Sequence, residues 1–519
     1  MSERFDVVVI GGGHNGLTTA CLLAAKGKQV AVVEKREGLG GLAESVEFEK
    51  GFRSAGVWHG PGNVSKETLA AIGLRDLTLQ DPAMSWALGD SGFAVPFAGP
   101  MDRTAFAIAQ RQPADGKNFA RYRNFLQRVR PVIERFLTHR PLNLLDVEHE
   151  APMEVLTRAL GLRMLGAHDM VELLRVAPMP VRDFLDEHFE MDVLKAALSF
   201  DALLGTFTAP RSPGTTLNQL VTGCMAGVSV RGGNVALTEA LVSRARSLGV
   251  RILNGSAVAR ILVHNDGVHG VELQDGMIVE AAAVSASCNP KPVLLDMLPV
   301  SALTHTTEHR IANVRCRGTA AQLLIAVDGP VDFRCAPEDE PVQHARVAPT
   351  PDHVEKAFDA VKYGRFHDEP VLDITVPSID NPSLAPAGKS VVNVLVSYVP
   401  AELDGGWTAA ARDALTRTTI ASIARFVEGF EKRVIAAKLS TPADLERDYG
   451  LPGGQLHHGE PAIDQTVIRP IPECFNHDTP VRGLTLCGSG THPGGSMSCL
   501  AGVQGAQAVL RSLKARAAA

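Results

Sequence analysis

The stretch Phe5–Gly16, F-D-V-V-V-I-G-G-G-H-N-G, decides the fold of this chain. Its first six residues are mostly apolar and rich in β-branched side chains, which is typical of a strand buried on both faces of a parallel sheet. Alanine- and leucine-rich sequence then predicts a helix over Leu17–Ala25, and Gln29–Val33 predicts a second strand that leads to Glu34. The stretch therefore predicts a strand, a glycine turn, a helix and a second strand.

This unit has the features of a dinucleotide-binding site. Gly11 permits a tight turn, Gly13 lets the backbone approach a pyrophosphate, and Gly16 lets the helix pack closely on the strand. The helix N-terminus offers free N–H groups to phosphate oxygens. Glu34 ends the second strand, where its carboxylate can accept hydrogen bonds from both hydroxyls of a ribose.

The residues after Glu34 indicate which dinucleotide is bound. Residues 35–41 are K-R-E-G-L-G-G. Here the chain resembles FAD-binding oxidoreductases of the glutathione-reductase-like superfamily, whose fingerprint runs from the ribose-binding Glu to a Gly-Gly pair. The resemblance implies FAD as the cofactor. It also implies an α/β fold, with a glutathione-reductase-like Rossmann domain interrupted by a mixed α+β substrate domain.

Size and composition limit the remaining possibilities. A chain of 519 residues exceeds the size at which one core keeps growing, so at least two domains are expected. The composition is 45% apolar and 21% charged with a net charge of −6, and it contains no Lys/Arg-rich run, which argues against nucleic acid as a partner. No signal-peptide pattern and no apolar stretch of membrane-spanning length occur, so we expect a cytoplasmic protein.

The eight cysteines argue against two further kinds of site. They are scattered and form no C-x-x-C pair. This spacing argues against a redox-active dithiol and against a thiolate zinc cluster, so no metal is expected.

The middle of the chain alternates between two patterns. Residues 105–202 are mainly helical, with an apolar face from Phe119 to Phe136 that we interpret as core contact; a substrate wall, a homodimer face and a peripheral membrane contact are the alternatives. Nucleotide-domain features return with Gly232-Gly233, a helix over residues 236–248, and three strands joined by Asp-Gly turns. Strands at 322–327, 371–376 and 390–399 are expected to form the floor of a substrate cavity, and a long helix is expected over about 408–430.

The closing part returns to the nucleotide domain. Residues 483–496, G-L-T-L-C-G-S-G-T-H-P-G-G-S, precede a helix expected over about 497–514. A strand, a glycine-rich loop and a helix N-terminus form a device that binds anions and carbonyls. We therefore assign residues 1–100, 226–295 and 471–519 to the FAD domain, and residues 101–225 and 296–470 to the substrate domain.

With both ends in view, the chain resembles the phytoene desaturase (phytoene dehydrogenase)-like flavoproteins, and within them the pyridine nucleotide-disulphide oxidoreductase domain-containing subgroup. Two more stretches agree, G-G-Q-L-H-H-G at 453–459 and F-T-A-P at 207–210. The resemblance implies contacts of Val258 on the adenine side of FAD and of the closing loop on the flavin ring. The implied cofactor residues are Gly11, Gly13, His14, Asn15, Gly16, Glu34, Lys35, Gly40, Gly41, Leu42, Val258, Gly490, Gly495, Ser496 and Met497.

The resemblance also implies the chemistry, in which a hydride leaves a substrate carbon for the flavin and a double bond forms. Some relatives instead isomerise double bonds on reduced FAD, and more distant ones oxidise amines. Leu42 stands where the amine oxidases have Arg, which argues against that branch. Aromatic residues make up only 5% of the chain, which argues against a long polyene tunnel.

Histidine is the natural base near neutral pH. Four histidines lie in glycine-rich segments expected near the flavin: His457 and His458, then His59 and His492. The alternative for each is a ring held by backbone hydrogen bonds in a tight loop. Because His457 and His458 are adjacent, only one of them can face a cavity from an extended segment.

The sequence thus favours an FAD-dependent dehydrogenase, or desaturase, acting on a hydrophobic or alicyclic small molecule. The sequence contains no second glycine fingerprint followed by its own acid. A separate NAD(P) domain is therefore not expected. Oxygen, a quinone or a protein carrier is therefore the expected electron acceptor. A redox-neutral isomerase, an amine oxidase and a flavoprotein scaffold without turnover are the alternatives.

Overall fold

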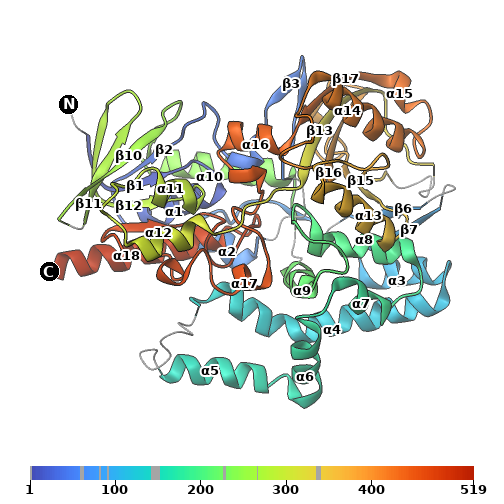
Figure 1. Ribbon diagram of the computed structural model, residues 1–519, viewed down its shortest axis with the longest axis horizontal. Coiled ribbons are helices and arrows are strands. Elements are labelled where there is room, and N and C mark those ends of the chain that lie inside the picture. Colours follow the sequence, from blue (N-terminus) through green and yellow to red (C-terminus); the bar gives the residue numbers. More distant parts are fainter. Residues whose placement is uncertain are drawn as a thin grey trace.

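The computed structural model describes residues 3–58, 64–80, 83–89, 93–141, 152–225, 229–265, 267–334 and 341–518. Two seven-stranded sheets organise the chain, and Figure 1 shows them side by side along the long axis of the molecule. Helices and strands alternate around the first sheet, so the predicted α/β class is confirmed.

The first sheet contains the predicted strand–turn–helix–strand unit. Its order is β10-β11-β12-β1-β2-β9, with β18 beside β12. Strands β18, β12, β1, β2 and β9 are parallel, whereas β10 and β11 run antiparallel as the predicted meander. Its strands are β1 (Glu3–Ile10), β2 (Val30–Val33), β9 (Arg251–Leu253), β10 (Val258–His264), β11 (Gly267–Leu273), β12 (Ile278–Ala286) and β18 (Leu484–Leu486).

Three helices from distant parts of the chain pack together over this sheet. They are α1 (His14–Ala24), α10 (Gly233–Ser247) and α18 (Leu500–Ala518). Their buried side chains share one core with β1 and β2, including Leu17, Leu241 and Val509. The sheet and these helices thus bring residues from the start, middle and end of the chain together at the carboxyl ends of β1 and β18.

The second sheet has the order β17-β13-β16-β15-β14-β6-β7 and is antiparallel except between β14 and β6. Trp86 and Leu88 face one core of this sheet and Ala87 faces the other, as expected for alternating strand residues. Its strands are β6 (Ser85–Leu88), β7 (Ala94–Ala98), β13 (Ala320–Asp328), β14 (His344–Val347), β15 (Val371–Thr375), β16 (Lys389–Ser397) and β17 (Val434–Ser440).

The predicted boundary at residue 100 is wrong on one point. Strands β6 and β7 precede it, yet β6 pairs with β14 and β7 pairs with β6, so both belong to the second sheet and neither pairs with a strand of the first. A short strand has a period of two wherever it pairs, so its sequence does not reveal its partner. We retain the other boundaries as a proposed division of the chain.

A layer of helices covers each face of the second sheet. On one face α4, α7 and α8 form a large core, and on the other α14 and α15 pack against the strands. With their neighbours α3, α9 and α13, the helices of this part of the molecule are α3 (Met101–Ala109), α4 (Pro113–Thr138), α7 (Val181–Asp186), α8 (Asp192–Leu203), α9 (Thr215–Met225), α13 (Pro351–Lys362), α14 (Ala409–Ala424) and α15 (Phe430–Arg433). The helix expected over 408–430 ends at residue 424, and Gly429, at φ 63°, leads into the separate α15.

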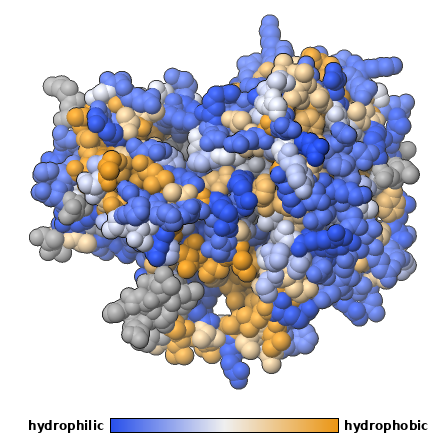
Figure 2. Space-filling model, in the orientation of Figure 1, coloured by the Kyte–Doolittle hydropathy of each residue, from blue (hydrophilic) through white to orange (hydrophobic). Residues whose placement is uncertain are grey.

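The predicted apolar face from Phe119 to Phe136 lies on α4. Its residues Phe119, Tyr122 and Val129 are fully or almost fully buried, so the interpretation as core contact is confirmed. By contrast, α5 (Pro152–Arg163) and α6 (Gly166–Val176) expose apolar side chains, and Figure 2 shows apolar colour gathered over this lower part of the molecule. Within the described ranges, no helix is long and apolar enough to cross a membrane.

Shorter elements connect these layers. They are β3 (Glu47–Glu49), β4 (Phe52–Arg53), α2 (Lys66–Ile72), β5 (Leu79–Gln80), β8 (Ser229–Val230), α11 (Pro290–Leu295), α12 (His305–Ala312), α16 (Pro442–Tyr449) and α17 (Ile463–Thr466).

The helical core makes a stability prediction. Phe184 of α7 is fully buried among aromatic side chains, so Phe184→Ala should lower the free energy of unfolding by about 3–5 kcal/mol. Phe106 of α3 is 68% exposed, and Phe106→Ala should change it by less than about 0.5 kcal/mol. Urea unfolding followed by circular dichroism measures both. Equal effects of the two substitutions would contradict the assignment of this core.

Candidate functional site

The glycine turn after β1 has the close backbone contacts that a dinucleotide cradle requires. Gly11 has a φ of 100°, in the left-handed region. A Cβ at position 16 would lie 2.0 Å from the carbonyl oxygen of Gly11, so only glycine lets α1 start so close to the strand. The N-terminus of α1, at His14, therefore faces the turn with its free N–H groups, as a pyrophosphate needs.

Glu34 is positioned beside this turn. One carboxylate oxygen, Oε2, accepts a hydrogen bond from the backbone N–H of Gly12 at 2.7 Å, and Oε1 accepts one from the N–H of Arg36 at 3.0 Å. The side chain is only 8% exposed. The carboxylate is thus fixed at the end of β2, next to the turn, where the predicted ribose contact would be made.

The predicted Gly-Gly pair lies directly against the turn. The N–H of Gly40 donates to the carbonyl oxygen of Gly12 at 2.9 Å, and Gly40 forms a bridge with Gly13. Gly41 has a φ of 59°, and a Cβ there would lie 3.2 Å from Cα of Gly13. The next residue, Leu42, accepts hydrogen bonds from the N–H groups of residues 57 and 58 and packs against a small core that includes Ala320 and Leu395 of the second sheet.

Two more residues predicted to contact FAD, Lys35 and Val258, lie in segments next to Glu34. Lys35 lies at the surface, and the partial burial of its ammonium group lowers the pKa of that group. The turn before Val258 reaches the same place, because the N–H of Ser256 donates to the carbonyl oxygen of Glu34 at 3.0 Å. Val258 itself is buried at the start of β10.

The closing loop is tied to the start of α1 by side chains from both. Nε2 of His14 lies 3.0 Å from the carbonyl oxygen of Ser496, and Asn15 donates from Nδ2 to Oγ of Ser489 at 3.2 Å. The N–H of Gly502 in turn donates to Oδ1 of Asn15 at 3.2 Å. The two glycine-rich motifs, nearly 500 positions apart, therefore form one surface.

The remaining closing-loop residues make close contacts with the stretch 453–459. A Cβ at Gly495 would lie 2.9 Å from Cα of His457, and one at Gly490 would lie 3.2 Å from the carbonyl oxygen of His458. Met497 is 2% exposed and packs into the core around α1. The expected helix begins at Leu500, three residues later than predicted, because the loop continues through Cys499 at φ 62°.

An inner cavity of about 130 Å³ borders this loop. Residues 493–496 and Ser498 form one wall, and His457 and Arg469 lie beside them. The other walls are mainly apolar, and most of their apolar side chains lie between residues 58 and 221 of the chain. They include Trp58, Leu137, Phe200, Leu204 and Val221.

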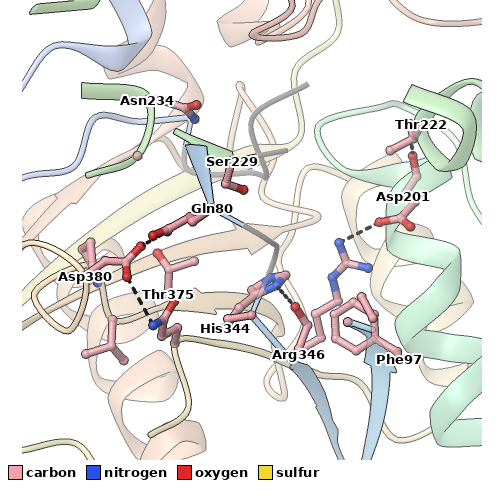
Figure 3. Close-up of a pocket in the computed structure, with 18 of the residues that line it drawn as sticks. Gln80, Phe97, Asp201, Thr222, Ser229, Asn234, His344, Arg346, Thr375 and Asp380 are labelled. Atoms are coloured by element: carbon pink, nitrogen blue, oxygen red, sulfur yellow. Dashed lines mark hydrogen bonds and ion pairs between the residues drawn. The ribbon is translucent and has the colours of Figure 1, made fainter. Parts of the chain in front are cut away.

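An outer cavity of about 280 Å³ adjoins the inner one, and the two share Asp201, Thr222 and Arg346 as lining residues. Figure 3 shows this outer cavity, with Asp380, Gln80 and Thr375 on one side and Asp201 and Thr222 on the other. Asp380 accepts hydrogen bonds from the amides of Gln80 at 2.5 Å and Gln343 at 3.3 Å. One wall of the outer cavity thus presents a carboxylate and two amides.

A buried ion-pair network separates the two cavities. Arg346 donates to Asp201 at 2.8 Å and to Asp373 at 3.2 Å, and its side chain is only 5% exposed. Asp373 also contacts Nε2 of His344 at 2.6 Å, while Nδ1 of His344 lies 2.9 Å from Ser85. Sequence analysis missed Asp201 and Arg346. The single acid within the apolar stretch A-L-S-F-D-A-L of α8 was the available signal for Asp201.

The structure separates the four candidate histidines. His457 lines the inner cavity and lies edge-on to Trp58, with ring centroids 5.2 Å apart. The adjacent His458 is not among the residues lining either cavity, and His492 packs against Phe136 with Nε2 2.9 Å from its carbonyl oxygen. His59 lies outside the described residues.

Burial keeps these histidines neutral. It lowers the pKa of His458 and of His492 to about 3 and that of His14 to about 4, and it also lowers the pKa of His457. Nε2 of His457 is 2.9 Å from the carbonyl oxygen of Leu204. His457 is therefore a neutral ring held by the backbone in the cavity wall.

Comparisons with known proteins agree with this geometry. The family described as FAD dependent oxidoreductase matches residues 6–363. The rat pyridine nucleotide-disulfide oxidoreductase domain-containing protein 2 is 32% identical over 99% of this chain and 94% of its own, and carotenoid 3,4-desaturase of Haloarcula japonica is 26% identical over 98% of each. Cyclohexylamine oxidase from Brevibacterium oxydans shares the fold, with a TM-score of 0.58 at 14% identity, over 98% of this chain and 99% of its own. The predicted resemblance and the predicted cofactor, FAD, are confirmed.

The glycine turn predicts a cofactor-loading defect. Gly16→Ala should reduce the FAD bound per protein at least tenfold, because the added methyl group would displace the Gly11 carbonyl and open the turn. Gly161→Ala is the control, since its nearest neighbour is Nη1 of Arg135 at 3.7 Å and alanine favours the helix. Flavin absorbance after reconstitution and gel filtration measures both. Normal loading of the Gly16 variant would contradict this cradle.

The buried histidines predict a loss of stability in acid. Their pKa is lower in the folded protein than the ordinary 6.5, so unfolding takes up protons below that pH. Their stabilising contribution is complete above pH 6.5 and falls as the pH drops towards 3. His492→Gln should therefore make the stability difference between pH 7 and pH 5 smaller by roughly 1–2 kcal/mol. Urea unfolding at both pH values, with His305→Gln on the exposed start of α12 as the control, tests this; an unchanged difference would contradict it.

Proposed function

Because this chain belongs to the FAD dependent oxidoreductase family, we propose that it is an FAD-dependent dehydrogenase that introduces a double bond into a hydrophobic or alicyclic substrate. The observation that supports this most directly is the inner cavity, in which apolar walls face the glycine-rich closing loop. FAD bound there would supply the hydride acceptor. The name of the Haloarcula relative, a carotenoid desaturase, favours the same chemistry.

The proposed FAD contacts follow from the cradle. The turn at Gly11, Gly13 and Gly16 would hold the pyrophosphate, and Glu34 would bind the ribose. The residues between these groups and the closing loop, Gly40, Gly41 and Leu42, would lie along the cofactor. Gly490 and residues 495–497 would contact the flavin ring, and Val258 the adenine side.

The two cavities suggest how a substrate lies. The inner walls, formed by side chains such as Phe200, Leu204 and Val221, offer apolar contact to the part of the substrate that reacts. The outer walls offer carboxylates and amides, among them Asp380 and Gln80. A compact substrate with an apolar reacting end and a polar far end fits both.

Desaturation removes a hydride from one carbon and a proton from its neighbour, so a base must accept the proton. Asp201 borders both cavities, its Oδ1 accepts from Arg346, and no hydrogen bond to its Oδ2 is seen among the described residues. His457, the base favoured by the sequence, has Nε2 directed at the Leu204 carbonyl. We therefore propose Asp201 as the proton acceptor, with His457 as the competing candidate.

Anaerobic titration of the FAD-loaded protein tests the function. Addition of the true substrate should bleach the flavin absorbance with one equivalent reduced per equivalent of product, and oxygen, a quinone or a protein carrier should then restore it. A panel of cyclic terpenes and ketones, polyenes and amines separates the alternatives. Product without bleaching would indicate an isomerase, and bleaching by amines alone would indicate an amine oxidase. No bleaching and no product with any class would favour a scaffold.

Two substitutions distinguish the candidate bases. Asp201→Asn should slow flavin reduction by about 10²–10⁴-fold, the usual contribution of a general base, whereas His457→Gln should slow it less than about tenfold. Asp186→Asn, on the exposed end of α7, is the control and should leave the rate unchanged. Stopped-flow absorbance measures the rate under anaerobic conditions. A larger effect of the His457 substitution would overturn the assignment of Asp201.

A further inference from the structure

Arg469 is a buried cation at the flavin end of the site that the sequence motifs did not include. Its side chain is 4% exposed and lines the inner cavity beside His457 and Gly494. Nη2 donates to the carbonyl oxygens of His457 at 3.1 Å and Gly459 at 2.9 Å. Arg469 thus joins the stretch 453–459 to the closing loop.

The closing loop leaves room for this guanidinium group. A Cβ at Gly494 would lie 3.0 Å from Nη1 of Arg469, and Gly494 has a φ of 112°, which side-chain-bearing residues rarely adopt. The glycine therefore permits both the bend of the loop and the approach of Nη1 to the cavity. The arrangement directs one end of the guanidinium at backbone carbonyls and leaves the other at the cavity wall.

The charge of Arg469 is not balanced by an acid within the described part of the chain. The one titratable group beside it whose charge would favour the cation is the thiol of Cys316, and burial raises the pKa of that thiol, so it is neutral. Burial lowers the pKa of Arg469 to about 10, which leaves the guanidinium charged at neutral pH. The other buried arginine of the cavity, Arg346, has two carboxylate partners.

An isolated buried charge is costly, so a site of this kind is completed by an anion. The histidines nearby cannot provide one, and Arg469 itself lowers the pKa of His457, His458 and His492. In the proposed placement of FAD, the flavin ring is the group at this wall. Reduced flavin carries negative charge over its N1 and C2 carbonyl, and the oxidised ring is neutral.

We propose that Arg469 stabilises the negative charge of the reduced flavin and so raises the two-electron potential of the bound FAD. This rests on the proposed placement of the flavin ring at the inner cavity, but it does not depend on which substrate is oxidised. A carboxylate or enolate of the substrate is the other anion that could face this arginine, and the experiment below distinguishes the two because no substrate is present.

Sulfite is the probe for this charge. It adds to N5 of oxidised flavin and leaves a negative charge on the N1–C2 side of the ring, so a neighbouring cation strengthens its binding. The wild-type protein loaded with FAD should bind sulfite, seen as bleaching of the long-wavelength flavin band, and should have a potential above that of free FAD. Absence of sulfite binding together with a potential at or below that of free FAD would overturn the proposal without any variant.

Two substitutions of Arg469 separate charge from structure. Arg469→Gln retains an N–H donor for the two carbonyls but removes the charge, and it should weaken sulfite binding at least tenfold and lower the potential by at least about 30 mV, which is tenfold for a two-electron couple. Arg469→Lys keeps the charge and should retain most of both properties. The FAD content and thermal unfolding of each variant are measured first.

The control is Arg315→Gln, which removes an arginine that pairs with Glu460 and Asp464 and lines neither cavity. It should leave sulfite binding and the potential unchanged. Equal sulfite affinity and potential in the wild type and an FAD-loaded Arg469→Gln variant would overturn the proposal. If that variant does not load FAD, sulfite binding and the potential of the wild type and of the Arg469→Lys variant test the proposal. If the Arg469→Gln substitution lowers the potential of the bound FAD but no substrate reduces the flavin, the role proposed for Arg469 is supported and the proposed dehydrogenase activity is not.

Discussion

The rest of the structure depends on the close approach of α1 and α18 at their N-termini. Gly502 permits it, because a Cβ there would lie 2.4 Å from the carbonyl oxygen of Asn15. Across this contact the N–H of Gly502 reaches Oδ1 of Asn15, and Oγ1 of Thr19 donates to the Gly502 carbonyl at 2.9 Å. The contact brings the two glycine-rich loops together, and each loop alone forms only half of the proposed cofactor site.

This constraint extends to the substrate side. The closing loop is held between α1 and the stretch 453–459, which in turn packs on β13 and on Leu204, the residue directly after α8. The inner cavity is therefore bounded by the closing loop, by β14 and β15 of the second sheet and by the helical layer, and its shape is fixed by contacts between segments that are distant in sequence. The helical core around α4 and α7 supports this wall because α8, with Phe200 and Asp201, packs against it.

The difference between what could and could not be predicted follows from this assembly. The sequence predicted the positions of Gly11, Gly16, Glu34 and the closing loop, because each belongs to a contiguous motif. In such a motif the residue types needed for a tight turn or for a phosphate contact can be recognised from the local sequence. Asp201, Arg346 and Arg469 were not found, because an isolated charged residue acquires its role only from partners in other segments. The misplaced boundary before α3 has the same cause, since β6 meets β14 only in the folded chain.

The electrostatics of the cavity follow a simple division. On the wall between the two cavities, Arg346 faces two carboxylates, Asp201 and Asp373, so that wall has no unpaired positive charge. On the wall beside the closing loop, the three buried histidines are neutral and Arg469 has backbone carbonyls as its partners. The fold therefore concentrates one positive charge at the loop proposed to hold the flavin. Such a fixed charge in a water-poor site acts on a group whose own charge changes during the reaction, which is the condition under which electrostatic preorganisation is most effective.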